Sequence, residues 1–328
     1  MGHMLGIKEW MGVSGKKFLD VRNTLENYLL QSNFQFYYFG AVSKRSIYSE
    51  NSHVLGESFL ENLIQLNKIN SDYIFAPEGT FRVYNHILNS GELQKNKKGK
   101  VFYSQEFMRN EPDYQVKNGK TFSFWQTGFE CYGYPSEEYA WLALKTTIEA
   151  LSLLSIDNLY FRISDKRIIE SLLEDLSIAE RRKIYGLIDN CSESPCLFQK
   201  EFIYQGGNVA LANEITALLS VTQNENFSIN DLTPYIKNKE AERGIIELQI
   251  MAEKIKKEYP KTGVKIISFM PKSWDACDAL LFDARIVGYP YAVAGGGSLN
   301  ALNEKYNCNK SGAGIGITRL VDYLTDNY

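Results

Sequence analysis

The stretch EFMRNEPDYQVKNGKTFSFWQTGFECYG, residues 106 to 133, decides the fold because it holds two extended runs around a polar loop. The first run ends in Arg109 and Glu111, two residues apart. In the second run, alternate positions are a ring, an amide, a glycine and a carboxylate: Phe124, Gln126, Gly128 and Glu130. Successive side chains of a strand point to opposite faces, so these four share one face. The stretch predicts a hairpin with an unusually long connection, 110–120, and long loops are often functional.

The side chains on this face suggest ligand binding. Phe124 offers a surface for stacking, and Gly128 is expected to leave room for a flat or bulky group. Burying Glu130 alone would be costly, which favours a cation docking beside it. Arg109 can hold a carboxylate or phosphate through two parallel hydrogen bonds. A solvated sheet face with a surface salt bridge is the alternative.

Composition limits the classes of protein that this chain can belong to. It has 328 residues, 44% hydrophobic and 23% charged, with a formal net charge of −3. These values are ordinary for a globular protein and give no global field that would attract nucleic acid. No apolar run of about 18 residues is present, and the start lacks the apolar core of a secretion signal. We therefore expect a cytoplasmic protein without a membrane segment.

Cysteine and histidine usage argues against several kinds of site. The 5 cysteines are irregularly spaced, so a disulfide framework is not expected. With only 3 histidines in the chain, a histidine-based triad or metal site is poorly supported.

Hydrophobic periodicity predicts an α+β fold, an antiparallel β-sheet flanked by helices, because hairpins and long excursions replace regular strand–helix alternation. Helices are expected at 14–32, 54–67 and 80–88, and at 135–154 with Ser136 as its cap. Strands are expected at 34–42, 72–80, 100–107, 121–133, 264–270, 278–286 and 291–296, and a glycine-broken strand runs into a helix at 312–324. Residues between about 164 and 260 are helical. The expected organisation is a core at 5–163, a helical insertion at 164–260 and the rest of the core at 261–328.

Two more motifs carry chemistry. Glu78 lies in APEGT, a tight turn after an apolar strand. GAGIGITRL places Gly312, Gly314 and Gly316 where a ligand could touch the backbone, and Arg319 in the first turn of a helix. The amides and the positive dipole of a helix start favour phosphate.

Together the motifs resemble a known family. Arg109-x-Glu111 and the following strand resemble motif 2 of class II aminoacyl-tRNA synthetases, and GIGITRL resembles motif 3. PEGT, QTGFECYG and AVAGGGSLNAL resemble the histidyl-tRNA synthetase branch. The resemblance covers roughly residues 14–328.

The resemblance implies roles for individual residues. ATP would be bound by Arg109, Arg319 and Lys120 at its phosphates, by Glu111 and Phe124 at its adenine, and by Gly316. Glu78, Thr80, Gln126 and Glu130 would receive the α-ammonium of an amino acid. Lys272 stands where the branch has an arginine, so the implied catalytic residues are Arg109, Arg319 and Lys272. Mg²⁺ would bridge the ATP phosphates without histidine or cysteine ligands.

Departures from the branch point to another amino acid. Its stretch R-G-L-D-Y-Y is KSWDAC here, and GGRYDGL is GGGSLNAL. Losing buried polar readout groups should abolish a preference for histidine. A rebuilt pocket is expected near Trp274, Asp275, Cys277, Leu299 and Asn300. Trp274 and Leu299 suggest a drier pocket, whereas Asp275 or Asp278 could meet a basic side chain. Alternatively, these residues only pack the sheet. Thr318 replaces the usual acid of motif 3.

The acceptor is expected not to be tRNA. No anticodon-binding domain is expected after motif 3, and loop 110–120 mixes Glu111 and Asp113 with Lys117 and Lys120, whereas tRNA prefers basic contacts. The leading interpretation is a homodimeric ligase that forms an aminoacyl-adenylate and passes it to a carrier protein, another protein or a small amine. One alternative is a non-catalytic regulator, similar to the histidyl-synthetase-like subunit of ATP phosphoribosyltransferase. Another is a synthetase core that needs a separate tRNA-binding partner.

Overall fold

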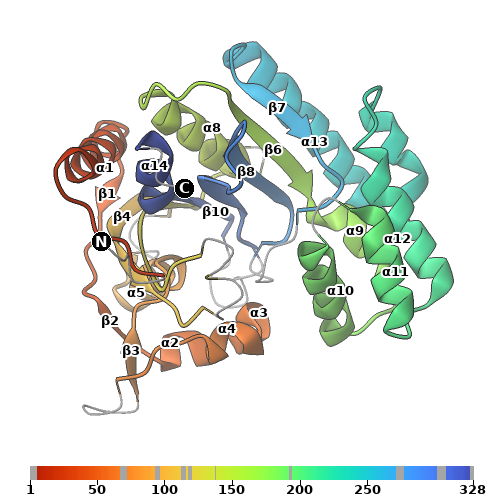
Figure 1. Ribbon diagram of the computed structural model, residues 1–328, viewed down its shortest axis with the longest axis horizontal. Coiled ribbons are helices and arrows are strands. Elements are labelled where there is room, and N and C mark those ends of the chain that lie inside the picture. Colours follow the sequence, from red (N-terminus) through yellow and green to blue (C-terminus); the bar gives the residue numbers. More distant parts are fainter. Residues whose placement is uncertain are drawn as a thin grey trace.

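A mixed, mostly antiparallel sheet forms the centre of the protein (Figure 1). The computed structural model describes residues 6–66, 72–92, 97–111, 116, 120–136, 138–191, 194–270, 277–300 and 308–325. Within these ranges 8 strands pair in the order β1-β4-β5-β10-β9-β8-β6-β7. Their bounds in that order are Gln35–Phe36, Gly99–Met108, Ser123–Tyr132, Lys310–Gly316, Ala294–Ser298, Leu280–Ile286, Leu159–Asp165 and Gly263–Ile266. The prediction of an α+β fold with an antiparallel sheet flanked by helices is confirmed.

Only the two edge pairs, β1 with β4 and β6 with β7, are parallel among these described strands. The β6–β7 pair has a clear cause, because the chain between the two strands is helical. A parallel connection requires such a crossover, whereas neighbouring antiparallel strands can be joined by a short turn.

Two hydrophobic cores cover the two faces of the sheet. On one face, α1 (Val13–Gln31), α8 (Tyr139–Ser152) and α14 (Ile317–Leu324) pack on β5, β9 and β10. The apolar stripe of α1, which is Val21, Leu25 and Leu29, is fully buried there. Helix packing on this face leaves the opposite face of the central strands to form a site.

The second core lies under that opposite face, toward the β4 side. It is built by α2 (Ser46–Ser49), α3 (Ser52–Leu55), α4 (Glu57–Glu61), α5 (Thr80–Asn89) and the small β2–β3 sheet (Val42–Lys44, Tyr73–Phe75). Tyr48, Tyr84, Tyr103 and Phe107 are its large buried side chains. This core holds the turn that carries Glu78 against β4.

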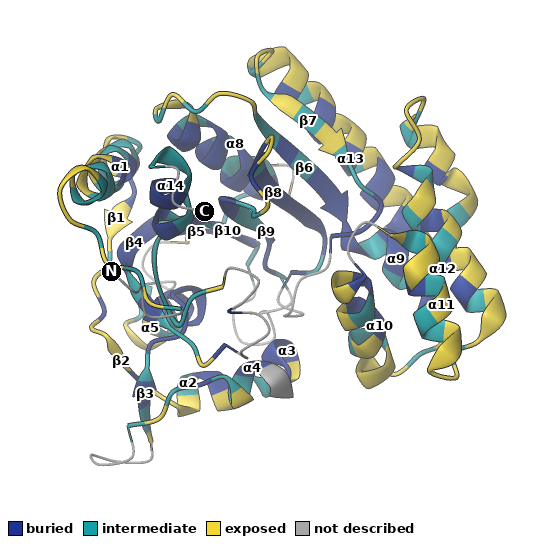
Figure 2. Ribbon diagram, viewed as in Figure 1, coloured by how far each residue is buried: buried dark blue, intermediate teal, exposed yellow. Residues whose placement is uncertain are grey.

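Helices follow β6 and stand beside the β6–β7 edge of the sheet (Figure 1). They are α9 (Lys166–Leu172), α10 (Ile178–Asn190), α11 (Pro195–Tyr204), α12 (Val209–Val221), a 3₁₀ turn (Ile229–Tyr235) and α13 (Lys239–Glu258). Side-chain oxygens of Asp165, Ser177, Ser194, Asn208 and Asn238 cap their first turns. Figure 2 shows exposed residues along their outer faces, in contrast to the buried central strands. No helix in the described part of the chain is long and apolar enough to cross a bilayer.

Three local predictions were wrong. The strand expected at 34–42 is only Gln35–Phe36, because the chain then leaves the large sheet to form β2, with Tyr38 71% exposed. The helix expected at 54–67 breaks at Gly56, whose φ of 79° is non-helical, and ends at Glu61. Ser136 does not cap α8: the helix begins at Tyr139, and the Ser136 hydroxyl accepts a hydrogen bond from Asn309.

The glycines of the central strands accommodate the protein's own side chains. A Cβ on Gly128 would lie 2.3 Å from the ring of Tyr103, its partner on β4. A Cβ on Gly312 would meet the Glu130 carboxylate at 2.2 Å, and one on Gly314 would meet the Gln126 amide at 2.3 Å. The expectation that Gly128 leaves room for a ligand was therefore wrong. Gly312 and Gly314 line a cleft together with Gly316, so the expectation that a ligand could touch their backbone stays a prediction. Gly316 alone of these four has no atom within 3.4 Å of the added carbon.

We predict that Gly128→Ala lowers the free energy of unfolding by roughly 1–3 kcal/mol, because the added methyl group overpacks a buried tyrosine ring. Gly186→Ala is the control, since Gly186 lies on α10 with open space around it. That change should instead raise stability by about 0.5–1 kcal/mol through helix propensity. Urea denaturation measures both. An unchanged unfolding free energy in Gly128→Ala would contradict the packing described above.

Candidate functional site

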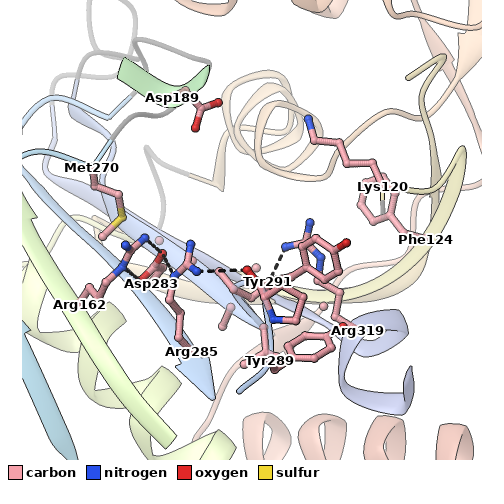
Figure 3. A pocket seen from close by; sticks show the side chains of 18 of the residues that line it. Lys120, Phe124, Arg162, Asp189, Met270, Asp283, Arg285, Tyr289, Tyr291 and Arg319 are labelled. Carbon is pink, nitrogen blue, oxygen red and sulfur yellow. Dashed lines mark hydrogen bonds and ion pairs between the residues drawn. The ribbon is translucent and has the colours of Figure 1, made fainter. Parts of the chain in front are cut away.

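A cleft of about 1270 Å³ opens on the uncovered face of the central strands (Figure 3). Its walls come from β4, β5, β8, β9 and β10, from the N-terminal segment 6–10, and from α10, α11 and α12. Most of the residues that the sequence pointed to line this one cleft: Thr80, Arg109, Glu111, Lys120, Phe124, Gln126, Leu299, Gly316 and Arg319. Glu78 and Glu130 are buried beside it, and Lys272, Trp274 and Asp275 lie outside the described residues.

Arg109 is held at the end of β4 by backbone and rings. Its Nε donates to the carbonyl oxygen of Pro77 at 2.8 Å. Its guanidinium lies over the rings of Phe124 and Phe59, at 5.1 Å and 5.6 Å from their centroids. A guanidinium has five N–H donors, so this arrangement fixes the group while leaving donors for a ligand.

Arg319 is fixed in the same manner from the other wall. Its Nη1 donates to the carbonyl oxygen of Ala292 at 2.7 Å, and its guanidinium lies 5.4 Å from the centroid of the Tyr291 ring. Arg319 sits in the first turn of α14, directly after β10. The two half-buried guanidiniums therefore face one cleft, one from the end of β4 and one from the start of α14, which suits a ligand with several anionic oxygens.

Two neighbouring contacts complete this end of the cleft. Lys120 donates to Glu111 at 3.4 Å, and the glutamate is buried while the lysine is 44% exposed. Thr318 accepts a hydrogen bond from the backbone N–H of Trp125 at 2.8 Å. The Thr318 hydroxyl thus connects α14 to β5. It has a structural role at the position where motif 3 usually has an acidic residue.

Two buried carboxyl groups lie behind Thr80. The Thr80 hydroxyl donates to Glu130 Oε1 at 2.6 Å, and the backbone N–H of Phe81 donates to both oxygens of Glu78 at 3.1 Å and 3.2 Å. Glu130 Oε2 is buried and accepts no hydrogen bond of good geometry from the described residues, although the Tyr84 hydroxyl is close enough to influence it. A hydroxyl that donates to a carboxylate keeps its lone pairs to accept from an ammonium group.

Burial raises the pKa of both carboxyl groups. The pKa of Glu78 rises to about 7, although the Phe81 N–H and the charge of Arg109 oppose the rise. Burial raises the pKa of Glu130 well above its usual range, and the hydrogen bond from Thr80 opposes this. Charged forms are disfavoured away from water, so an arriving cation would favour ionisation of both groups.

The part of the cleft expected to read an amino acid side chain is apolar among the described residues. Cys277 and Leu299 line it and are buried. Asn300 does not: it donates through Nδ2 to the Tyr139 hydroxyl at 2.9 Å, on the far side of the sheet. Asp278 likewise accepts from Ser298 at 2.5 Å and from the Asn300 N–H at 3.1 Å. The pocket roles expected for Asn300 and Asp278 were wrong, because their side chains point away from the cleft, whereas the adjacent residues Leu299 and Cys277 line it.

A charged group that no sequence motif indicated also lines the cleft: Arg162, Asp283 and Arg285. Arg162 and Asp283 are paired across β6 and β8. The available signal was the alternation of Asp283 and Arg285 in the strand LLFDARI, which places two opposite charges on one face. As for metals, no group of three or more histidine, cysteine, aspartate or glutamate side chains in the described ranges could hold an ion.

Comparisons with known proteins show which family the chain resembles. The histidyl-tRNA synthetase family matches residues 80–319. Histidine–tRNA ligase from Pyrobaculum aerophilum is 25% identical over 225 residues, covering 67% of this chain and 52% of the relative. The enzyme from Pyrobaculum islandicum is 25% identical over 232 residues, covering 67% and 51%. This chain spans about half the length of these curated relatives.

Solved structures share the fold. An ATP phosphoribosyltransferase regulatory subunit/histidyl-tRNA synthetase from Bacillus halodurans superposes with a TM-score of 0.80 at 14% identity, covering 98% of this chain and 83% of that one. The ATP phosphoribosyl transferase (HisG:HisZ) complex from Thermotoga maritima gives 0.65 at 15% identity, with 91% and 96% covered. Similarity at this level of identity concerns the fold alone.

We predict that Glu78→Gln flattens the pH dependence of stability. Because the folded-state pKa is raised, wild-type Glu78 contributes stability below about pH 4.5 that is lost as pH rises toward 7. The loss amounts to roughly 3 kcal/mol over that window. Urea denaturation at a series of pH values measures it, with Glu253→Gln on the exposed side of α13 as the control. An equally steep dependence in Glu78→Gln would contradict the assignment.

Proposed function

The chain belongs to the histidyl-tRNA synthetase family, and from that premise we propose that it activates an amino acid with ATP, forming an aminoacyl-adenylate and pyrophosphate. The observation that carries the proposal is the convergence of Arg109, Phe124 and Arg319 on one cleft, beside the Thr80–Glu130 pair. A ring, two guanidiniums and buried acceptors match the adenine, the phosphates and an ammonium group.

The chemistry requires positioning and charge stabilisation. The carboxylate of the amino acid attacks the α-phosphorus of ATP, and the bond to the β-phosphate breaks as pyrophosphate leaves. No general base is needed, since the nucleophile is already an anion. Arg109 and Arg319 would stabilise the negative charge on the reacting phosphate, and their anchored geometry means that little reorganisation is required.

Mg²⁺ fits this cleft as a companion of ATP. Glu111, Asp283 and Asp322 are the buried carboxylates among its described lining residues, and each already accepts from a cation. The ion would therefore be held mainly by the phosphate oxygens, whose charge it neutralises when bound.

The amino-group site would be formed by Thr80 and Gln126, with Glu130 and Glu78 behind them. Thr80 and Gln126 line the cleft, and the two buried carboxyl groups supply the negative charge. An ammonium group brought to Thr80 would be partly neutralised by Glu130, which favours a substrate with a free α-amine.

We propose that the amino acid is not histidine and that the acceptor is not tRNA. Cys277 and Leu299 give the described side of the specificity pocket an apolar lining, and an imidazole requires polar partners. A carrier protein, another protein or a small amine would receive the activated group. We further propose a homodimer, because half-exposed Phe36 lies on the edge strand β1 and exposed Tyr38 follows it.

A non-catalytic regulatory role is the second candidate function. It is favoured by the structural likeness to the Bacillus halodurans protein, described as an ATP phosphoribosyltransferase regulatory subunit/histidyl-tRNA synthetase, and to the ATP phosphoribosyl transferase (HisG:HisZ) complex from Thermotoga maritima. A synthetase core that works with a separate tRNA-binding partner is a further variant of the first proposal. ATP–pyrophosphate exchange over a panel of amino acids separates the ligase from the regulator, since a regulator shows no exchange with any amino acid.

We predict that Arg109→Ala reduces amino-acid-dependent ATP–pyrophosphate exchange by about 2–4 kcal/mol of transition-state stabilisation, the typical effect of removing one preorganised donor. Arg243→Ala is the matched control, because Arg243 lies on α13 with 56% of its side chain exposed and pairs with Glu247. If wild-type protein binds no ATP in calorimetry at millimolar nucleotide, the ligase proposal is wrong.

We also predict that ATP, radiolabelled histidine and total tRNA give no charged tRNA with this protein. Exchange with a different amino acid, without charging of tRNA, is the expected pattern. An authentic histidyl-tRNA synthetase run in parallel controls for the quality of the tRNA. Robust histidine charging by this chain would refute both the amino acid and the acceptor proposals.

A further inference from the structure

The cleft contains a charged group that neither the motifs nor the comparisons explain. Arg162 on β6 and Asp283 and Arg285 on β8 lie on its floor (Figure 3). Figure 3 shows Arg285 between the Arg162–Asp283 pair and the Tyr291 and Arg319 side chains. The group therefore continues the row of cations that begins at Arg319.

Asp283 joins the two arginines. Arg162 donates from Nε to Oδ1 at 3.0 Å and from Nη2 to Oδ2 at 2.7 Å, a two-point contact that the β6–β8 register aligns. Arg285 donates from Nε to Oδ2 at 3.2 Å. Asp283 is 5% exposed and carries one negative charge, so the three side chains together keep a net positive charge facing the cleft.

Arg285 and Arg319 are anchored to the same short segment. Arg285 Nη1 donates to the carbonyl oxygen of Pro290 at 3.3 Å, and Arg319 Nη1 donates to that of Ala292 at 2.7 Å. The two guanidiniums are close enough to interact: burial lowers the pKa of Arg319, and the positive charge of Arg285 lowers it further. Two like charges in a partly buried cleft repel each other unless an anion lies between them.

The donors of Arg285 are arranged for such an anion. Its Nε and Nη1 are used within the protein, and its Nη2 makes no hydrogen bond with the described residues. Its side chain is 22% exposed, compared with 15% for Arg162. The inner arginine thus holds the aspartate, and the outer arginine presents a donor to the cleft.

We propose that Arg285 is a phosphate-binding residue that, together with Arg319, holds the polyphosphate chain of ATP, and that Asp283 and Arg162 position it. This assignment rests on the proposed function. When the bond between the α-phosphorus and the bridging oxygen breaks, the electron pair goes to the departing pyrophosphate. A fixed cation at that end stabilises the added charge.

Binding of a nucleotide series to Arg285→Ala tests the assignment by calorimetry. Losing a hydrogen bond to a charged partner should raise the Kd of ATP about tenfold or more. The Kd of ADP should rise less, and those of AMP and adenosine should stay unchanged, because only the outer phosphates reach Arg285. If Arg285 had only a structural role, its loss would weaken the binding of all four ligands alike. Arg243→Ala, which removes a distant exposed arginine, should alter none of them.

Two further variants test the positioning roles and guard against misfolding. Arg285→Lys keeps the positive charge but not the planar, forked arrangement of guanidinium donors, so it should retain part of the ATP affinity that Arg285→Ala loses. Arg162→Ala should weaken ATP binding less than Arg285→Ala does. The ATP affinity of the double variant should resemble that of Arg285→Ala alone. Additive losses in the double variant would contradict the positioning role of Arg162.

The outcomes separate this assignment from the proposed function. If the wild-type protein binds ATP and Arg285→Ala binds it with unchanged affinity, only the assignment of Arg285 is wrong. Arg285→Lys takes the place of Arg285→Ala in this comparison if the alanine variant fails to fold. A raised KM for the amino acid with unchanged ATP affinity would place Arg285 at a substrate carboxylate and also refute it. If the wild-type protein binds no ATP, the assignment and the proposed function fail together.

Discussion

The in-register pairing of β4 with β5, closed by the ring of Tyr103 over Gly128, is the constraint on which the rest of the site depends. The register runs from Gly99 opposite Tyr132 to Met108 opposite Ser123, and a buried hydrogen bond joins Ser104 and Thr127 across it. A slip of one residue would turn every side chain of a strand to the other face. The same register carries Arg109 past the strand end to the ring of Phe124.

The glycines of β10 extend this constraint to the second half of the chain. Their missing side chains let Glu130 and Gln126 of β5 lie flat against β10, which brings α14 and Arg319 to the same cleft. Arg109 and Arg319 are about 210 residues apart in the sequence (319 − 109), yet both line this cleft. Close packing of the strands is therefore one physical reason for the glycines at 312 and 314.

Electrostatics divides the cleft into two parts. Cations are fixed by carbonyl oxygens, rings and Asp283 along one part, where the proposed ATP phosphates would lie. Two carboxyl groups with raised pKa values lie behind Thr80 in the other. The groups in both parts are buried or partly buried, so an incoming charge would interact with them more strongly than in bulk water. This separation of charge is what an amino acid and ATP require of a common site.

Local sequence determined much of this protein. Alternation along 123–132 predicted one face for Phe124, Gln126 and Glu130, periodicity predicted α1, α5 and the helices between β6 and β7, and the motifs predicted the family. Those features depend on residues that are close together in the sequence, so the spacing of residue types along the chain can predict them. Only the tertiary structure decided that Tyr103 fills the space at Gly128, that Asn300 and Asp278 face away from the cleft, and that Arg162, Asp283 and Arg285 meet beside Arg319. Each of these contacts joins residues from different strands or turns, and which groups meet there is set by strand order and register, which no local spacing records.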